Sequence, residues 1–528
     1  MSAFVIKLLL LLGFAALMIG VGVYCRKHST DVNGFVLGGR SVGPWLTAFA
    51  YGTSYFSAVV FVGYAGQFGW RYGLAATWAG IGNALIGSLL AWAVLGRRTR
   101  IMTQHLDSAT MPQFFGERFQ SPALKIAASI IIFIFLIPYT ASLYNGLSRL
   151  FGMGFNIDYS VCIILMAILT AIYVVVGGYM ATAINDFIQG IIMLVGIIMV
   201  IAAVLLSKGG FQASLAGLGE VTDPAVAAVP GVLNGATPGI FSSFLGPDPL
   251  NLLFVVILTS LGTWGLPQMV QKFYAITNES AIQKGTVIST LFAFVVAGGS
   301  YFLGGFGRLF SNKVDIAANG YDSIIPAMLE DLHPALIALV VILVLAASMS
   351  TLSSLVIASS STLTIDFLKG NFMKNMSEKK QLFFIRVLIV VFIAISAIIA
   401  LIQYKSKVTF IAQLMGISWG ALAGSFLAPF LYALYWKRTT KLACWTCFLF
   451  GSLLMVADMI PATKAMLPAF MQSPINCGAI AMLAGLAIVP VVSFLSQAPE
   501  SAIVEKIFSC YDRKVVVSVK TSVGEDAQ

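Results

Sequence analysis

The chain has 528 residues, of which 59% are hydrophobic and only 10% are charged, and its mean hydropathy is +0.93. Soluble domains carry about 25% charged residues, so this composition excludes a soluble globular protein. Long apolar runs favour membrane-spanning helices over the short alternating strands of a barrel. The formal net charge of +10 is typical of a membrane protein whose cytoplasmic loops collect Lys and Arg. We therefore expect the lipid bilayer as a partner and no nucleic acid.

The apolar runs predict an all-α integral membrane protein with about 13 transmembrane helices. In chain order, the expected spans are 3–24, 45–68, 74–96, 123–148, 158–178, 183–206, 248–268, 284–307, 334–364, 382–403, 408–436, 441–460 and 474–496. Most of the 31 Lys and Arg residues, Lys272 among them, fall in segments that face inward when the N-terminus is outside. This bias predicts a multi-pass protein of the cell membrane, plasma or inner, with its C-terminus in the cytoplasm.

The longest connection is rich in Gly, Ala and Pro, and it divides the middle ten spans into two sets of five. Because five is an odd number, the second set is inverted relative to the first, and such repeats build a binding site near mid-membrane. The expected organisation is 1–44 as an N-terminal span and cytoplasmic loop, 45–206 as the first repeat, 207–247 as an extracellular loop, 248–436 as the second repeat, 437–496 as two additional spans and 497–528 as a cytoplasmic tail.

Two spans at matching places in these halves are interrupted, over residues 51–57 and 259–268. Proline removes a backbone donor, and the carbonyls that it frees inside a membrane need a partner such as a cation. Close packing through small residues is the alternative, but the paired positions favour a binding site. The residues that we expect at the breaks are Gly52, Gly262, Gly265 and Pro267.

The ninth span ends in a run of hydroxyl residues. Hydroxyls can bond to the carbonyls of their own helix, but so dense a run beside a broken helix favours a hydrophilic wall. Neutral oxygens suit a dehydrated hard cation, so Ser350 and Thr351 could each supply one, with help from unwound carbonyls of the second span. The run comprises Ser348, Ser350, Thr351, Ser353, Ser354, Ser359, Ser360, Ser361, Thr362 and Thr364.

Acidic residues are scarce inside the spans, and Asp186 lies just inside the sixth one at its cytoplasmic end. It is either a cation site on an exit path or a carboxylate at a helix N-terminus. A proton-driven carrier needs a titratable group at mid-depth, and the broken spans and the hydroxyl run contain none. The residues therefore favour Na⁺ as the coupling ion, with Asp186 as the one position where a proton could act instead.

Several short motifs, in this order and at these spacings, resemble the sodium:solute symporter family over about residues 5–500. They are Leu-Gly-Gly-Arg-Ser at 37–41, Val-Gly-Gly-Tyr-Met-Ala at 176–181 before Asn-Asp at 185–186, Gly-Leu-Pro-Gln at 265–268 and Met-Ser-Thr-Leu-Ser at 349–353. The resemblance implies a LeuT-type core of two inverted five-helix repeats, with one N-terminal and two C-terminal helices added. It also implies a sodium site made of the hydroxyls of Ser350 and Thr351 and the carbonyls of Thr53, Phe56 and Ala347, with Asp186 on the inner sodium path.

Two positions depart from the proline-transporting branch of that family. Tyr55 stands where the branch has an aspartate, and Thr259 falls where it has a tryptophan. The segments 53–58, 68–74 and 265–267 look nearer the pantothenate and monocarboxylate branch. We therefore expect a small carboxylate-bearing solute, with proline or another amino acid as the alternative. The side chains expected to line its pocket are Tyr55, Ser57, Tyr139, Thr259, Thr263 and Trp264.

The resulting hypothesis is a sodium-driven symporter that imports a small organic solute by alternating access. An enzyme is not expected, because the chain has neither an H-E-x-x-H motif nor a phosphate-binding G-x-x-x-x-G-K-[ST] loop. A proton-coupled carrier or a channel is the less favoured alternative. Uptake by a carrier saturates, and uptake by a sodium symporter collapses when the sodium gradient is removed.

Overall fold

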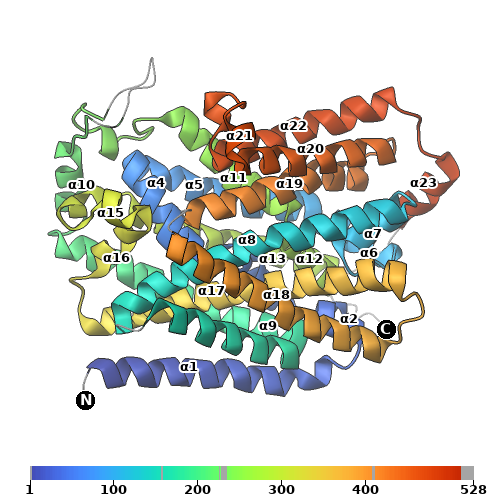
Figure 1. The fold of residues 1–528 in the computed structure, drawn as a ribbon, viewed down its shortest axis with the longest axis horizontal. Coiled ribbons are helices and arrows are strands. Elements are labelled where there is room, and N and C mark those ends of the chain that lie inside the picture. The colour runs from blue at the N-terminus through green and yellow to red at the C-terminus, as the bar shows by residue number, and fades with distance from the viewer. Residues whose placement is uncertain (1–2, 156–157, 225, 227–234, 407–410, 513–528) are drawn as a thin grey trace, which may run out of the picture.

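The computed structural model describes residues 3–155, 158–224, 226, 235–406 and 411–512. These residues are almost entirely helical, and most of the long helices run along one common direction (Figure 1). The only β-type pairing among them is a single bridge between Val42 and Ile276. The prediction of an all-α protein is therefore confirmed.

The long helices and the segments continuous with them make up the body of the molecule. They are α1 (Ala3–Cys25), α3 (Pro44–Tyr55), η3 (Val59–Tyr64), α4 (Ala65–Tyr72), α5 (Thr77–Gly82), η5 (Asn83–Leu90), η6 (Trp92–Gly96), α6 (Arg97–His105), α8 (Pro122–Phe155), α9 (Tyr159–Ser207), α11 (Pro249–Gly265), α12 (Pro267–Ala275), α13 (Glu279–Ala293), η8 (Phe294–Gly298), α14 (Gly299–Gly304), α17 (Pro334–Thr362), η11 (Leu363–Phe372), α18 (Glu378–Ser406), α19 (Ile411–Tyr435), α20 (Lys441–Met459) and α22 (Pro474–Leu495). Shorter helices connect them: α2 (Val32–Leu37), α7 (Met111–Arg118), α10 (Phe211–Glu220), α15 (Ile316–Asn319), α16 (Ile324–Leu329), α21 (Pro461–Lys464) and α23 (Ser501–Phe508).

Within the described residues, 10 helices are long and apolar enough to cross a membrane, or up to 11 when the bent pair α11–α12 counts as one span. Two of the 10 are 47 and 48 residues long, although about 20 residues suffice. Each contains a glycine with positive φ, Gly73 at 64° and Gly178 at 58°, where two predicted spans meet. A membrane-spanning bundle is therefore confirmed, whereas the predicted number of 13 spans is not.

The most buried helices lie in the middle of the bundle. Helix α17 packs against α8, α9, α3 and α18, and α19 packs against α8 and α11. The first helix and the last two long ones lie outside them. Helix α1 covers α9 on one side, and α20 and α22 cover α19 on the other (Figure 1). This arrangement leaves the breaks in α3 and α11–α12 enclosed by protein, because Phe56 and Leu266 are buried.

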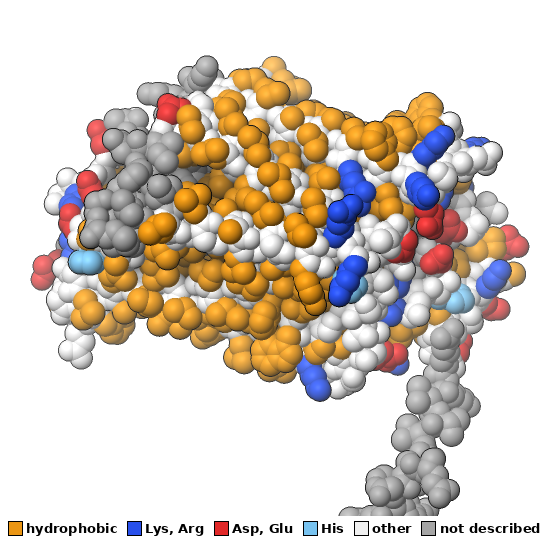
Figure 2. Space-filling model, turned by 90° about the horizontal axis from the view of Figure 1, so that it is seen from below, with side chains coloured by type: hydrophobic (Ala, Val, Ile, Leu, Met, Phe, Trp, Pro, Cys, Tyr) orange, Lys and Arg blue, Asp and Glu red, His pale blue; other side chains and the backbone are white. Residues whose placement is uncertain are grey.

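The outer surface is suited to lipid. Figure 2 shows one side of the molecule as a broad apolar face, with charged side chains gathered toward its ends. Long apolar side chains such as Leu9, Ile164 and Ile198 are about half exposed. Apolar exposure on this scale would be unfavourable in water, so it indicates a face covered by acyl chains.

Glycines allow two of the inner helices to touch backbone to backbone. A Cβ atom added to Gly69 in α4 would lie 2.0 Å from the carbonyl carbon of Gly304 in α14, and one added to Gly304 would lie 2.0 Å from the Ala65 oxygen. Small residues at helix contacts are a common device of membrane bundles, because close approach there maximises van der Waals contact.

We expect Gly304→Ala to lower the unfolding temperature of the detergent-purified protein, because the new methyl group would overlap the backbone of α4. Overpacking of this kind costs about 1–3 kcal/mol. The matched control is Gly298→Ala, since a Cβ atom there meets nothing within 4 Å. Equal unfolding temperatures for the two variants would contradict this account of the α4–α14 contact.

Candidate functional site

Two enclosed helices are interrupted by single residues in extended conformation. Helix α3 ends at Tyr55, and Phe56 follows with φ −83° and ψ 116°. Helix α11 ends at Gly265, and Leu266 follows with φ −81° and ψ 123° before α12 begins at Pro267. The second break bends the chain by 46°. The two halves of the chain thus contain breaks of nearly the same backbone geometry.

Each break has a local cause in the sequence. Proline disfavours helical geometry in the residue before it, and its missing N–H is tolerated in the first turn of a helix. Pro267 therefore sets Leu266 extended and begins α12. At the first break, the Ser57 side chain helps to begin the next helical segment, because its Oγ accepts a hydrogen bond from the Val59 amide, 3.2 Å away.

The breaks are narrower than the sequence predicts. Gly265 and Pro267 flank the second break, but Gly52 and Gly262 lie inside α3 and α11. A Cβ atom at Gly52 would lie 2.4 Å from the Phe292 ring, and one at Gly262 would lie 2.7 Å from the Trp419 ring. These two glycines therefore serve close packing, which was the alternative interpretation of such residues.

The first break opens onto α17, where five oxygen atoms come together. The Ser350 hydroxyl lies 3.2 Å from the Thr53 carbonyl oxygen and 3.0 Å from that of Ala347. The Thr351 hydroxyl lies 3.1 Å from the Thr53 oxygen, 3.3 Å from the Phe56 oxygen and 3.1 Å from the Ala347 oxygen. These residues are all fully or almost fully buried. We call this set, made of Thr53, Phe56, Ala347, Ser350 and Thr351, the oxygen cluster.

The oxygen cluster has more acceptors than protons. Ser350 and Thr351 supply two hydroxyl protons, whereas their oxygens make five close approaches to three carbonyls. Each proton satisfies one approach well, so the remaining ones bring lone pairs together in a buried setting. A small cation placed among them would turn this repulsion into coordination.

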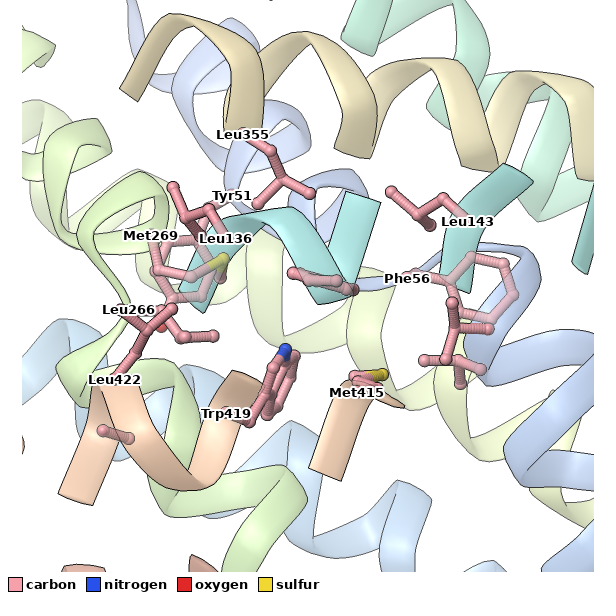
Figure 3. Packing of buried hydrophobic residues seen from close by; sticks show 14 of the residues in the cluster. Tyr51, Phe56, Leu136, Leu143, Leu266, Met269, Leu355, Met415, Trp419 and Leu422 are labelled. Carbon is pink, nitrogen blue, oxygen red and sulfur yellow. The ribbon is translucent and has the colours of Figure 1, made fainter. Parts of the chain in front are cut away.

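Aromatic side chains from α8 and α19 also meet in the region of the two breaks. The Tyr139 ring lies 6.0 Å from the Trp419 ring in an edge-to-face arrangement, and the Tyr139 hydroxyl is fully buried. Figure 3 shows Trp419 in the same packed region as Phe56 and Leu266, the residues at the two breaks. Sequence reasoning missed Trp419, although its direct neighbours Ser418 and Gly420 are small.

The other residues predicted for the solute pocket are used differently. The Thr259 hydroxyl donates to the Val255 carbonyl of its own helix at 2.9 Å. The Thr263 hydroxyl lies 3.0 Å from the Gly87 oxygen and 2.9 Å from the Ser260 oxygen of its own helix, and the Trp264 indole donates to the Ile86 oxygen at 2.9 Å. These polar groups therefore bind backbone, two of them that of η5. The side chain of Tyr55 lies outside the described residues.

Asp186 is fully buried in α9, about two turns beyond the break at Gly178. This distance is too long for a first-turn carboxylate that would stabilise a helix N-terminus. Its nearest cation is Lys272, whose Nζ lies 4.0 Å from Asp186 Oδ2. The assignment of Lys272 to a cytoplasmic loop is wrong, because α12 continues to Ala275 and buries this side chain.

Comparison with known proteins agrees with this geometry. The model of the sodium:solute symporter family matches residues 35–451. The chain is 29% identical over 442 residues to the osmoregulated proline transporter OpuE of Bacillus subtilis, which covers 83% of this chain and 85% of that protein. It is 31% identical over 449 residues to a sodium/proline symporter of Staphylococcus aureus, which covers 83% of each.

A solved structure shares the fold. It is the substrate-bound outward-open state of a Na⁺-coupled sialic acid symporter, with a TM-score of 0.71 and 16% sequence identity. The likeness covers 94% of this chain and 99% of that one. The family match extends over most of the chain and contains both breaks and the oxygen cluster. The chain therefore belongs to the sodium:solute symporter family.

Proposed function

We propose that this protein imports a small amino acid, proline in the first place, together with Na⁺ held in the oxygen cluster. Na⁺ is the coupling ion of the family to which the chain belongs. The observation that carries the proposal is the convergence of Thr53, Phe56, Ala347, Ser350 and Thr351 at a helix break, with O···O distances of 3.0–3.3 Å.

The chemistry of the oxygen cluster favours a monovalent cation. All five oxygens are neutral, and a divalent ion such as Ca²⁺ usually recruits carboxylates. Hydroxyls and carbonyls neither gain nor lose a proton near neutral pH, so the oxygen cluster cannot couple transport to protons. Because its oxygens come from α3 and α17, a bound ion would pull these two helices together beside Ser57 and favour the outward-open state.

The solute assignment departs from the expectation based on sequence. The relatives with 29–31% identity are named as proline transporters, so the preference for the pantothenate and monocarboxylate branch is not supported. Proline is also a small solute that bears a carboxylate. Ser57, Tyr139 and Trp419 offer it aromatic surface and a few polar groups, which is the usual make-up of a small-molecule pocket. Tyr55 and Thr259 are the departures that such a pocket has to accommodate.

We place the protein in the cell membrane, with the N-terminus outside and the C-terminus in the cytoplasm, because Lys and Arg concentrate in the segments that this orientation turns inward. Under this orientation α3 and α12 are the cytoplasmic halves of the two broken helices. Alternating access would then open and close the path beside these two segments.

We expect Ser350→Ala combined with Thr351→Ala to raise the Na⁺ concentration that gives half-maximal uptake by about tenfold or more, which corresponds to about 1.4 kcal/mol. The reason is the loss of two of the five proposed ligands. The measurement is solute uptake into proteoliposomes as a function of external Na⁺.

The matched control for this experiment is Ser361→Ala. This residue is buried in the same helix, and within the described part of the chain its hydroxyl donates only to the Ala358 carbonyl, 3.3 Å away. Uptake by the control should keep its sodium dependence. If the double variant also keeps it, the oxygen cluster is not the coupling site.

We expect proline and Na⁺ together to raise the unfolding temperature of the purified protein more than either does alone. Stabilisation follows ligand occupancy, so a ligand at 100 times its Kd adds about 2.7 kcal/mol. Pantothenate, pyruvate and other amino acids form the comparison panel. A sodium-dependent shift with pantothenate and none with proline would assign the chain to the other branch.

A further inference from the structure

A lysine and an aspartate are buried together beside the oxygen cluster, and the proposed transport cycle does not yet use the lysine. Lys272 and Asp186 expose 1% and 0% of their side chains. Taking two charges out of water costs several kcal/mol per ion, and charged groups inside a membrane bundle usually mark function. The desolvation cost of this pair is therefore larger than packing alone would justify.

The lysine contacts two other helices directly and a third through a serine. Lys272 Nζ donates to Ser354 Oγ of α17 at 3.0 Å and lies 5.0 Å from the centre of the Tyr179 ring of α9. Ser354 in turn shares a hydrogen bond of 2.9 Å with Ser54 of α3. One ammonium group thus joins α12 to α9 and α17, and through Ser354 to α3.

The carboxylate of Asp186 has a charge partner but lacks hydrogen-bond donors among the described residues. At 4.0 Å the contact with Lys272 is an ion pair and is too long for a hydrogen bond. Among the described residues, no hydrogen-bond donor reaches either carboxylate oxygen of Asp186. The ammonium therefore balances the charge of Asp186 but leaves its lone pairs open to another cation.

This pair lies next to the oxygen cluster, on the predicted cytoplasmic side. Ser354 is one helical turn beyond Ser350 on the same face of α17, and Ser54 directly follows Thr53. A sodium ion that leaves the cluster along α17 toward the cytoplasmic end therefore meets the ammonium of Lys272 first.

We propose that Lys272 is a tethered cation that closes the inner sodium path: its ammonium occupies the cation position between Asp186 and Ser354 and holds α12 against α9 and α17. Inward release requires that Na⁺ replace the ammonium at Asp186, which frees α12 to move. This inference rests on the proposed function, since it presumes that the oxygen cluster holds Na⁺.

The test is equilibrium binding of radioactive sodium, with no solute present, to the purified full-length chain. We expect the wild type and Lys272→Arg to bind one ion per chain, because both keep a cation beside Asp186. We expect Lys272→Met to bind two, because the uncovered carboxylate and the hydroxyl of Ser354 form a second site. A double variant, Lys272→Met with Asp186→Asn, should return to one.

A purely structural ion pair would change stability but not the number of ions bound. One ion on a folded Lys272→Met protein would therefore overturn the proposal. If that variant does not fold, Asp186→Asn decides: the ammonium left without its anion should weaken sodium binding in the neighbouring cluster by about tenfold or more, and unchanged affinity would overturn the proposal. A wild type that binds no sodium would instead contradict the proposed function.

Discussion

The architecture depends on how backbone carbonyls are satisfied where helices break inside the bundle. In hydrocarbon, every backbone polar group has to find a partner within the protein. At the first break, the oxygens of Thr53 and Phe56 face the hydroxyls of Ser350 and Thr351, so α3 and α17 depend on each other at this point. At the second break, Pro267 removes a backbone donor, and Leu266 joins α11 to α12 in extended conformation.

Much of this arrangement could be predicted from the sequence. Hydropathy gives the bundle, and the serine-threonine run together with the interrupted spans points to the atoms that meet in the oxygen cluster. The limits were also physical. A glycine inside a helix looks the same in sequence whether it breaks the helix, as first expected for Gly52, or admits a neighbouring ring such as Phe292. Thr263 and Trp264 have the chemistry of a pocket but donate to carbonyls of η5, and pairings between distant segments leave no local pattern.

Lys272 illustrates the same limit for charged residues. When Lys and Arg are counted to assign the orientation, every lysine near the end of a span is treated as a loop residue. Lys272, however, lies on α12 and is buried within the bundle. Two residues considered together could have indicated this ion pair. One is the acidic residue within the sixth span, Asp186, and the other is the basic residue a few positions beyond a proline break, Lys272. Only the fold places these two side chains 4.0 Å apart, because α9 and α12 belong to different halves of the chain.

The short bridge between Val42 and Ile276 has a mechanical consequence. The Val42 amide donates to the Ala275 carbonyl at 3.2 Å, and the Thr277 amide donates to the Val42 carbonyl at 3.1 Å. Val42 precedes α3 and Ala275 ends α12, so the outermost ends of both half-helices are joined by main-chain atoms. A displacement of either half-helix is thereby transmitted to the other, so the two would move at that face as one joined unit.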